Sequence, residues 1–259
     1  GYGLSGSGIN DISLEIKSGE IVAVLGMNGS GKTTLGRALG GLLPVHSGVI
    51  LIDDQALSPE DLRSRVTYLF SPVQGQFIGN TIEEDILFGL ECRRLNAQEI
   101  AERLERTLAS FDLMLLRERK WQQLSEGELQ RAALAAVLAL EPDYLILDEP
   151  TATLDHATTQ QLYQLLAKLK NQGRGLVVLT NQIEEAARAD RVVIMSEGTV
   201  VASGLPRQVL ADDDLQSRPF KAVAFQVAQA LVDQGLRLGD GTLDTEGLVD
   251  AIWHWWGRS

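Results

Sequence analysis

The chain has 259 residues, 44% hydrophobic and 22% charged, which is the composition of an ordinary globular protein that can fill a core. Its formal net charge of −12 argues against nucleic acid as a partner and against broad adhesion to an anionic membrane, because both need positive potential. Cys92 is the single cysteine, so an internal disulfide is excluded, and the longest apolar run, 132–140, is about half the ~20 residues that span a bilayer.

The first part of the chain, to about residue 70, is predicted to form strands with one helix among them. Three apolar residues alternate with polar ones, as on a half-buried strand: Ile12, Leu14 and Ile16. The continuous apolar run 21–25 is typical of a strand buried on both faces, and a helix is predicted to follow it from about Lys32. Further strands are expected at 49–52 and 66–70.

Between the strand at 21–25 and the helix lies a glycine-rich loop that matches the phosphate-binding P-loop pattern. The predicted nucleotide-binding residues are Gly26, Asn28, Gly29, Ser30, Gly31, Lys32, Thr33 and Thr34. Small residues let backbone N–H groups curl around phosphate oxygens, and the helix points its positive end at them. Lys32 adds a positive charge for the outer phosphates, and the Thr33 hydroxyl suits Mg²⁺, which favours oxygen. The alternative is a glycine-rich turn with an incidental lysine.

The middle of the chain is predicted to be helical. Three helix starts are indicated by a capping residue followed three positions later by an acid: Thr81 with Glu84, Asn96 with Glu99, and Ser125 with Glu128. Strands and helices then alternate, with strands at 144–148, 176–180 and 191–195. This rhythm indicates a mostly parallel sheet with crossover helices.

The strand at 144–148 ends in two carboxylates, Asp148 and Glu149. In a parallel sheet the ends of neighbouring strands share one edge, where ligands bind. We therefore expect Asp148 to hold Mg²⁺ through water and Glu149 to orient or deprotonate an attacking water. The alternative is a strand that merely ends in polar residues, and the P-loop makes that the poorer interpretation.

The tail of the chain begins after an acidic run at 212–214. It carries two helical apolar stripes, one of Phe220, Val223, Val227 and Leu231, the other of Leu248, Ile252 and Trp256. We expect a main domain at 1–211 and a helical appendage at 212–259 that serves dimerisation. The tryptophans Trp253, Trp255 and Trp256 would be a membrane-interface anchor in the alternative interpretation, but their helix carries acids rather than a basic face. The scattered histidines His46, His156 and His254 are assigned no metal.

The order of these motifs resembles that of the ABC ATPase family, over roughly residues 2–210. Leu124-Ser125-Glu126-Gly127-Glu128 stands where that family has the signature Leu-Ser-Gly-Gly-Gln, and Leu147-Asp148-Glu149-Pro150-Thr151 with Leu154-Asp155 resembles its Walker B strand and D-loop. The resemblance implies a two-lobed α/β P-loop domain with a mostly parallel core sheet, an antiparallel β subdomain and a helical signature subdomain at about 72–140.

The same resemblance implies a head-to-tail dimer. Each ATP, with Mg²⁺, would lie between one subunit's P-loop and the other's signature residues, which are Ser125, Glu126, Gly127 and Glu128 in this chain, with Asp155 in the D-loop. Tyr2 stands where the family places an aromatic that stacks on adenine. The alternative for Tyr2 is a stray aromatic on an edge strand.

The stretch 75–89 resembles more narrowly the energy-coupling factor (ECF) ATPases, including the cobalt and nickel importers, which carry a similar acidic stretch after the Q-loop. This likeness implies a transmembrane coupling subunit, a substrate-binding membrane protein, import of metals or vitamins, and a peripheral place on the cytoplasmic face of the cell membrane. ABC proteins that act on DNA or ribosomes fit less well, because no long coiled-coil insert fits between Lys32 and Ser125 and no basic linker is present.

Three departures from the family pattern bear on hydrolysis. Asn181 replaces the H-loop histidine; it can donate a hydrogen bond but cannot carry a proton. Ser71 occupies the Q-loop glutamine position and would need a water to reach Mg²⁺. Glu126 and Glu128 put negative charge near a triphosphate unless they point away, although both suit the start of a helix. We expect a subunit that hydrolyses ATP and drives its membrane partners through ATP-driven dimer closure, in a heterodimer with a more regular ATPase or sister domain rather than in a homodimer. The alternative is a degenerate, binding-only subunit of such an asymmetric heterodimer, with little turnover of its own.

Overall fold

The structure is a computed structural model that describes residues 8–93 and 95–210. The described residues fall into two compact units, the first made of residues 8–15, 20–32 and 178–210 and the second of residues 16–19 and 33–177. Tyr2, the acidic run 212–214, the predicted tail helices, the tail tryptophans and His254 lie outside the described residues. In the part that is described, no helix combines the length and the apolar character needed to cross a membrane.

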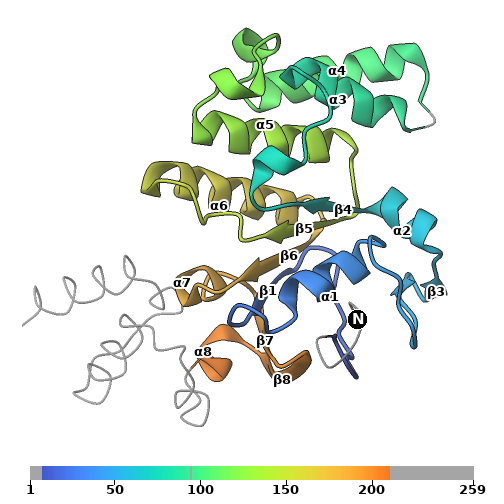
Figure 1. The fold of residues 1–259 in the computed structure, drawn as a ribbon, viewed down its shortest axis with the longest axis vertical. Helices are drawn as coiled ribbons and strands as arrows, with labels where there is room; N and C mark the ends of the chain where they lie inside the picture. Colours follow the sequence, from blue (N-terminus) through green and yellow to red (C-terminus); the bar gives the residue numbers. More distant parts are fainter. Residues whose placement is uncertain (1–7, 94, 211–259) are drawn as a thin grey trace, which may run out of the picture. The chain divides into compact units, whose positions relative to one another are not determined.

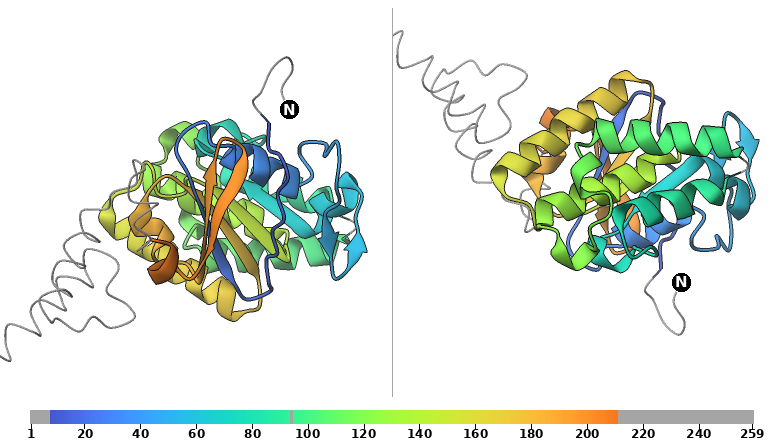
Figure 2. Two further views of the ribbon diagram at one scale, coloured as in Figure 1. Left: turned by 90° about the horizontal axis from the view of Figure 1, so that it is seen from below. Right: turned by 90° about the horizontal axis from the view of Figure 1, so that it is seen from above.

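The first unit is built on β1 (Ile21–Leu25), β7 (Arg191–Ser196) and β8 (Thr199–Gly204). β1 pairs in parallel with β7, and β7 turns back into β8 as an antiparallel hairpin, seen in the left view of Figure 2. Two short helices, α7 (Ile183–Ala186) and α8 (Pro206–Val209), belong to this unit. They contribute to one apolar core with the strands: Ala23, Leu25, Ile183, Ala186, Val192, Ile194 and Val209.

The strand expected around Ile12, Leu14 and Ile16 is a wrong prediction, since residues 8–20 form no regular strand. The alternation is nevertheless present, because these three side chains are half-buried while the residues between them are exposed. The backbone of this segment makes a hydrogen bond to the β7–β8 turn, in which the N–H of Asn10 donates to the carbonyl of Gly198 at 2.9 Å. The alternation of apolar and polar residues therefore shows which side chains of this segment are partly buried, and it does not show that the segment pairs as a strand.

In the second unit, β4 (Val66–Leu69) and β5 (Tyr144–Asp148) run in parallel, with Tyr68 opposite Ile146. The boundary between the units falls within β6 (Gly175–Thr180). The strand predicted at 49–52 is shorter than expected, since β2 (Leu51–Ile52) forms only a small antiparallel pair with β3 (Gln55–Ala56). The predicted mixed, mostly parallel sheet is confirmed.

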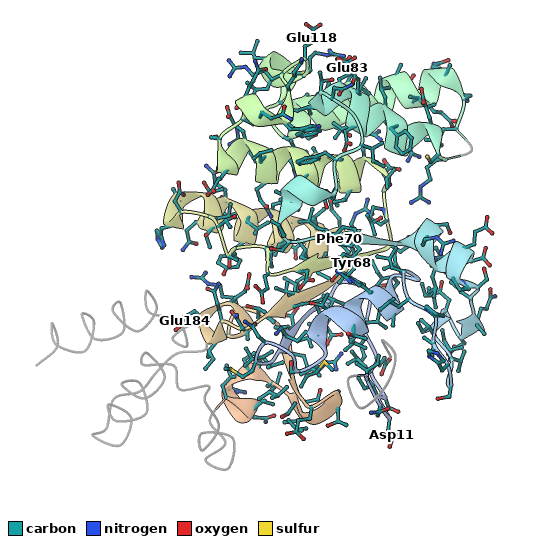
Figure 3. All side chains as sticks on the ribbon, viewed as in Figure 1. Asp11, Tyr68, Phe70, Glu83, Glu118 and Glu184 are labelled. Carbon is teal, nitrogen blue, oxygen red and sulfur yellow. The ribbon has the colours of Figure 1, made fainter. Side chains whose placement is uncertain are left out.

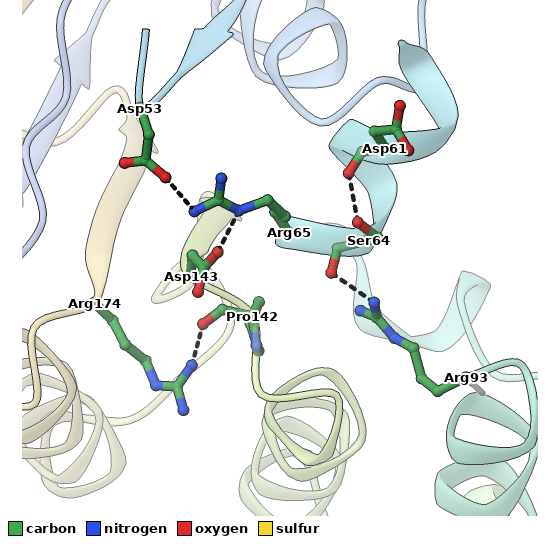
Figure 4. Close-up of polar contacts among 8 residues, drawn as sticks. All are labelled: Asp53, Asp61, Ser64, Arg65, Arg93, Pro142, Asp143 and Arg174. Atoms are coloured by element: carbon green, nitrogen blue, oxygen red, sulfur yellow. Dashed lines mark hydrogen bonds and ion pairs between the residues drawn. The ribbon is translucent and has the colours of Figure 1, made fainter. Parts of the chain in front are cut away.

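The N-terminal ends of β4 and β5 are fixed by arginines (Figure 4). Arg65, the last residue of α2 (Pro59–Arg65), forms ion pairs with Asp53 at 2.8 Å and with Asp143 at 2.5 Å. Two more arginines donate to backbone carbonyls, Arg93 to that of Ser64 and Arg174 to that of Pro142. These contacts tie the end of α2, which leads into β4, and the loop that precedes β5. The ladder register then determines which residues meet at the opposite ends of the two strands.

Three helices of the second unit pack side by side: α3 (Ile82–Glu91), α4 (Ala97–Ser110) and α5 (Glu126–Ala139) (Figures 1 and 2). All three predicted starts are confirmed, because the side-chain oxygens of Thr81, Asn96 and Ser125 accept the backbone N–H three residues later. Two other helices complete the described chain, α1 (Lys32–Leu39), which begins at the unit boundary, and α6 (His156–Asn171). Short 3₁₀ turns lie at Val73–Gly75, Met114–Leu116 and Trp121–Gln123.

The acidic start of α3 holds the loop that precedes it. Asp85 accepts hydrogen bonds from the backbone of Ile78 at 2.7 Å and Gly79 at 3.0 Å, and Glu84 accepts one from Asn80 at 2.8 Å. A Cβ at Gly79 would lie 2.5 Å from the backbone nitrogen of Asp85, so the close approach requires glycine. The acidic stretch that carries the ECF likeness therefore has a local structural role in this chain.

The same loop is joined to the segment that leads into α5. The indole of Trp121 stacks on Phe77 with ring centroids 3.5 Å apart, and its N–H donates to the carbonyl of Gly79 at 2.6 Å. Arg117 binds Glu83 through two hydrogen bonds, at 2.6 and 2.9 Å, and these hold the pKa of Glu83 below its ordinary value.

Candidate functional site

The predicted P-loop lies between β1 and α1, and it closes around Lys32. The Lys32 ammonium donates to the carbonyls of Gly26 at 2.6 Å and Met27 at 3.2 Å, and the side chain is buried. The N–H of Ser30 donates back to the Met27 carbonyl at 3.0 Å, which makes the loop a tight turn. The helix that follows has no acidic residue in its first turn, so the positive end of its dipole is not neutralised there.

Two glycines are required by the path of this loop. Gly29 and Gly31 have φ angles of +84° and +103°, in the left-handed region that other residues rarely adopt. A Cβ at Gly31 would also come within 3.1 Å of Ile9 and 3.3 Å of the Gly198 backbone. The loop is thus held at close quarters inside the first unit, and it can present backbone N–H groups to phosphate as the sequence predicted.

Thr33 and Asp148 are brought together in the second unit. The Thr33 hydroxyl lies 3.1 Å from Oδ2 and 3.4 Å from Oδ1 of Asp148. Both side chains offer oxygen only, which is the donor set that Mg²⁺ prefers, and Mg²⁺ commonly takes one or two protein oxygens together with phosphate oxygens and water. The residues present therefore fit the expected ion. Thr33 directly follows Lys32 at the start of α1, so one turn of helix serves both the loop and this pair.

A third residue joins this pair that the sequence interpretation missed. The Tyr68 hydroxyl donates to Oδ2 of Asp148 at 2.7 Å. Burial raises the pKa of Tyr68, and the hydrogen bond to Asp148 and its charge raise it further against a smaller opposing effect of Arg37. The phenol therefore stays protonated and acts as the donor. Tyr68 on β4 and Phe70, directly after that strand, lie close together, with ring centroids 4.7 Å apart (Figure 3).

Glu149 follows β5 in a left-handed turn. Its φ is +46°, a conformation that costs a non-glycine residue about 1–2 kcal/mol, and its carbonyl accepts the N–H of Ala152 at 3.2 Å. The buried amide of Gln130 donates to the carbonyl of the next residue, Pro150, at 3.1 Å. Gln130 lies on α5, so the helix that begins at the signature also holds the turn of the expected catalytic glutamate. Sequence reasoning gave Gln130 no role.

The signature residues lie at the start of α5, where Ser125 and Glu128 form a capping box with each other. Glu128 accepts hydrogen bonds from the Ser125 N–H at 2.7 Å and from the Ser125 hydroxyl at 2.9 Å, while its own N–H donates to Ser125 Oγ at 3.3 Å. The backbone hydrogen bond from Ser125, followed by the one from its hydroxyl, lowers the pKa of Glu128. Glu126 is exposed, and a Cβ at Gly127 would meet Thr158 at 3.3 Å.

The D-loop aspartate is also a helix cap. Asp155 precedes α6 and accepts the N–H of Thr158 at 2.7 Å, and this backbone hydrogen bond lowers the pKa of Asp155. Ser71 and Asn181 stand where the family has the Q-loop glutamine and the H-loop histidine, and both are exposed. Ser71 lies after β4, and Asn181 directly follows β6. The side chain of the nearby Gln76 forms a hydrogen bond within the chain, since its oxygen accepts the N–H of Phe70 at 3.1 Å.

The signal that would have revealed Tyr68 is present in the strand pattern. Side chains alternate along a strand, so Val66 and Tyr68 share one face of β4 as Ile146 and Asp148 share one face of β5. Finding the contact requires the pairing register of the two strands, which the sequence alone does not give.

Comparison with known proteins agrees with these motifs. The family model described as "ABC transporter" matches residues 9–152. The chain is 37% identical over 253 residues to the energy-coupling factor transporter ATP-binding protein EcfA1 of Streptococcus sanguinis (strain SK36), covering 95% of this chain and 90% of that protein. It is 35% identical over 254 residues to EcfA1 of Bacillus subtilis (strain 168), covering 95% and 89%.

Two solved structures are similar as well. cbiO1 from Clostridium perfringens, described as part of the ABC transporter complex cbiONQ, has a TM-score of 0.71 and 32% identity, covering 82% of this chain and 88% of that one. The ATP-binding cassette MJ0796, in a dimeric post-hydrolysis state bound to ADP and Pi, has a TM-score of 0.67 and 29% identity, covering 77% and 90%.

Proposed function

Because this chain belongs to the ABC transporter ATPases, we propose that it powers an importer of the energy-coupling factor type that carries metal ions or vitamins. The chain is an ATPase of this family, and its similarity to EcfA1 proteins extends over 95% of its length. The observation that carries the proposal is the contact between the Thr33 hydroxyl and the Asp148 carboxylate. Thr33 directly follows Lys32 in the sequence. This pair and the loop before it supply the charge and donors that a Mg²⁺-nucleotide needs.

In the proposed reaction, the backbone of residues 26–31 and the Lys32 ammonium hold the phosphates of ATP. Thr33 and Asp148 would hold Mg²⁺, which when bound would offset the negative charge of the phosphates. Glu149 orients a water and takes its proton as the water oxygen bonds to the γ-phosphorus; the bond to the ADP oxygen breaks, leaving ADP and phosphate. Asn181 donates a hydrogen bond to the γ-phosphate, and Ser71 reaches the ion through a water.

The proposal includes a partner ATPase that differs from this chain. Nucleotide-driven dimer closure would set Ser125 and Gly127 of one subunit against the ATP of the other, and Glu128 here already binds the Ser125 hydroxyl. A homodimer would repeat that feature in both sites, whereas a heterodimer confines it to one. The further partners are a transmembrane coupling subunit and a substrate-binding membrane protein, which place the complex at the cytoplasmic face of the cell membrane. The tail at 212–259 is proposed to serve dimerisation.

A second candidate function is favoured by the same capping box. In this alternative the chain binds ATP as the degenerate half of an asymmetric pair and turns over little of it alone. The carboxylate of Glu128 beside Ser125 is the specific observation in its favour, because negative charge opposes a triphosphate.

The test is to measure Mg-ATP affinity and steady-state hydrolysis of the purified chain and of its Glu149→Gln variant. We expect turnover to fall about 100-fold or more in the variant with nucleotide affinity retained, because removing the base affects the chemical step. Glu197→Gln is a matched control, since Glu197 is an exposed glutamate with a φ of +50° in the β7–β8 turn. Tight Mg-ATP binding with no turnover, or with turnover that Glu149→Gln leaves unchanged, would favour the second candidate. Failure to bind Mg-ATP would overturn both.

A further inference from the structure

The position of Tyr68 follows from the pairing of β4 with β5. Tyr68 lies opposite Ile146 in this parallel ladder, and Asp148 is two residues further along β5, on the same face. Such diagonal neighbours lie within reach of a long aromatic side chain. The Tyr68 hydroxyl consequently meets Oδ2 of Asp148 at 2.7 Å, a length typical of a strong bond from a hydroxyl to a carboxylate.

The carboxylate of Asp148 is held unevenly. Oδ2 receives the Tyr68 hydroxyl at 2.7 Å and the Thr33 hydroxyl at 3.1 Å, whereas Oδ1 has only the longer Thr33 contact at 3.4 Å among the hydrogen bonds of the described residues. Asp148 and Tyr68 are both buried, at 8% and 6% exposure, so water has little access to replace either donor. The phenol therefore fixes the rotation of the carboxylate about its last bond.

Thr33 is expected to serve both the ion and this carboxylate, because a hydroxyl that ligates Mg²⁺ through a lone pair keeps its O–H to donate. Tyr68 has no such second duty, and it sits on a strand whose end is held by the bond from the Phe70 N–H to Gln76. Tyr68, with the shorter contact, is thus a second donor to Oδ2 that takes no part in binding the ion.

We infer that Tyr68 is a positioning residue for the Mg²⁺ site: it binds Oδ2 of Asp148 and leaves Oδ1 to face the ion. The inference rests on the proposed function, in which Asp148 helps to hold Mg²⁺. It also assigns β4 a route to the ion site that does not depend on Ser71, the residue that stands in the Q-loop glutamine position. A hydrogen-bonded neighbour that orients a metal ligand typically contributes about 10- to 100-fold to metal affinity.

The test is Tyr68→Phe in the full chain, which keeps the ring and removes the hydroxyl. A fluorescent ATP analogue is titrated with EDTA present, and Mg²⁺ is then titrated at a fixed nucleotide concentration. We expect the Mg²⁺ concentration for half-maximal response to rise about tenfold, with the Mg²⁺-free nucleotide affinity changing less than about twofold. Mn²⁺ in place of Mg²⁺ gives an independent spectroscopic readout, in which the fraction of bound Mn²⁺ falls by a similar factor.

Two further variants separate the possible outcomes. Tyr144→Phe is the control, because it also removes a tyrosine hydroxyl, but at the end of β5 opposite to Asp148. It should leave the Mg²⁺ dependence unchanged. Asp148→Asn removes the carboxylate charge and should shift the Mg²⁺ dependence more than Tyr68→Phe. If Asp148→Asn shifts it and Tyr68→Phe does not, the inference is overturned while the proposed function stands. If Asp148→Asn has no effect, the proposed ion site itself is wrong. Loss of Mg²⁺-free binding in Tyr68→Phe would assign the phenol a structural role instead.

Discussion

Helices α1 and α5 each begin at a loop that the ABC family uses to bind phosphate, and the two beginnings differ in charge and in hydrogen bonding. α1 follows two glycines with positive φ, carries Lys32 as its first residue and has no acid in its first turn. α5 begins at Ser125 and has two acids in its first turn, Glu126 and Glu128. Glu128 and Ser125 satisfy one another through three hydrogen bonds.

The difference shows which helix start is open to an external anion. A helix N-terminus attracts phosphate because its first N–H groups lack partners within the helix and its dipole is positive there. In α5 the capping serine takes one of these N–H groups and the two carboxylates offset the dipole. We propose that this chain binds nucleotide through its own α1, and that its α5 is a weaker partner for a phosphate held elsewhere.

The largest expected effect tests the α1 half of this comparison. Lys32→Ala removes the charge for the outer phosphates and should weaken Mg-ATP binding about 100-fold, because charge-assisted contacts to phosphate are among the strongest polar interactions. Isothermal titration of the folded variant with Mg-ATP measures this. Lys168→Ala is the control, since Lys168 is an exposed lysine in the last turn of α6. Equal affinity in Lys32→Ala would show that α1 is not the nucleotide site.

The second effect tests α5 directly. Changing Glu126→Gly together with Glu128→Gln, in a Glu149→Gln background that slows hydrolysis, should increase ATP-dependent dimer formation about 30-fold. The reason is that two negative charges near a triphosphate each cost about 1 kcal/mol at a solvated surface. Sedimentation with and without ATP measures the association. Glu102→Gln with Glu118→Gln removes the same charge from exposed positions of the second unit and should have no such effect. A similar gain in that control would assign the change to net charge alone.

The two helix starts also differ in how far the sequence revealed them. The strand at 21–25, the helix start at Lys32 and the strand ending in Asp148 were predicted with correct boundaries, because glycine, lysine and a terminal acid have special backbone or charge requirements. The capping serine Ser125 was predicted for the same kind of reason. The contact of Tyr68 with Asp148 and that of Gln130 with Pro150 were not predictable, since each depends on pairing or packing between segments at least twenty residues apart. The paired strand expected around Ile12 failed because alternation reports burial and not a hydrogen-bonding partner.

A third, smaller effect measures the capping box as a structural element. Ser125→Ala removes the oxygen that accepts the Glu128 N–H and should lower the free energy of unfolding by about 1 kcal/mol. Denaturant unfolding followed by circular dichroism gives the value. Ser110→Ala is the matched control, because the Ser110 hydroxyl donates within the last turn of α4 and caps no helix start. Comparable losses in both variants would mean that the Ser125 cap has no special weight in α5.

The smallest effect concerns the pH dependence of the stability that the Ser125–Glu128 capping box gives to the start of α5. The pKa of Glu128 is lower in the folded protein than in the unfolded chain, so its contribution to stability is present above the unfolded pKa of about 4.3 and is lost as the pH falls through the folded value. Glutamine can complete a capping box but carries no charge, so Glu128→Gln should cost about 0.5 kcal/mol at pH 7, allowing for solvent screening. The stability gap between the two proteins should shrink as the pH falls from 5 toward 3, in urea unfolding at each pH. A gap that stays constant over this range would mean that the charge of Glu128 does not stabilise the start of α5, and the contrast with α1 would then rest on hydrogen bonding alone.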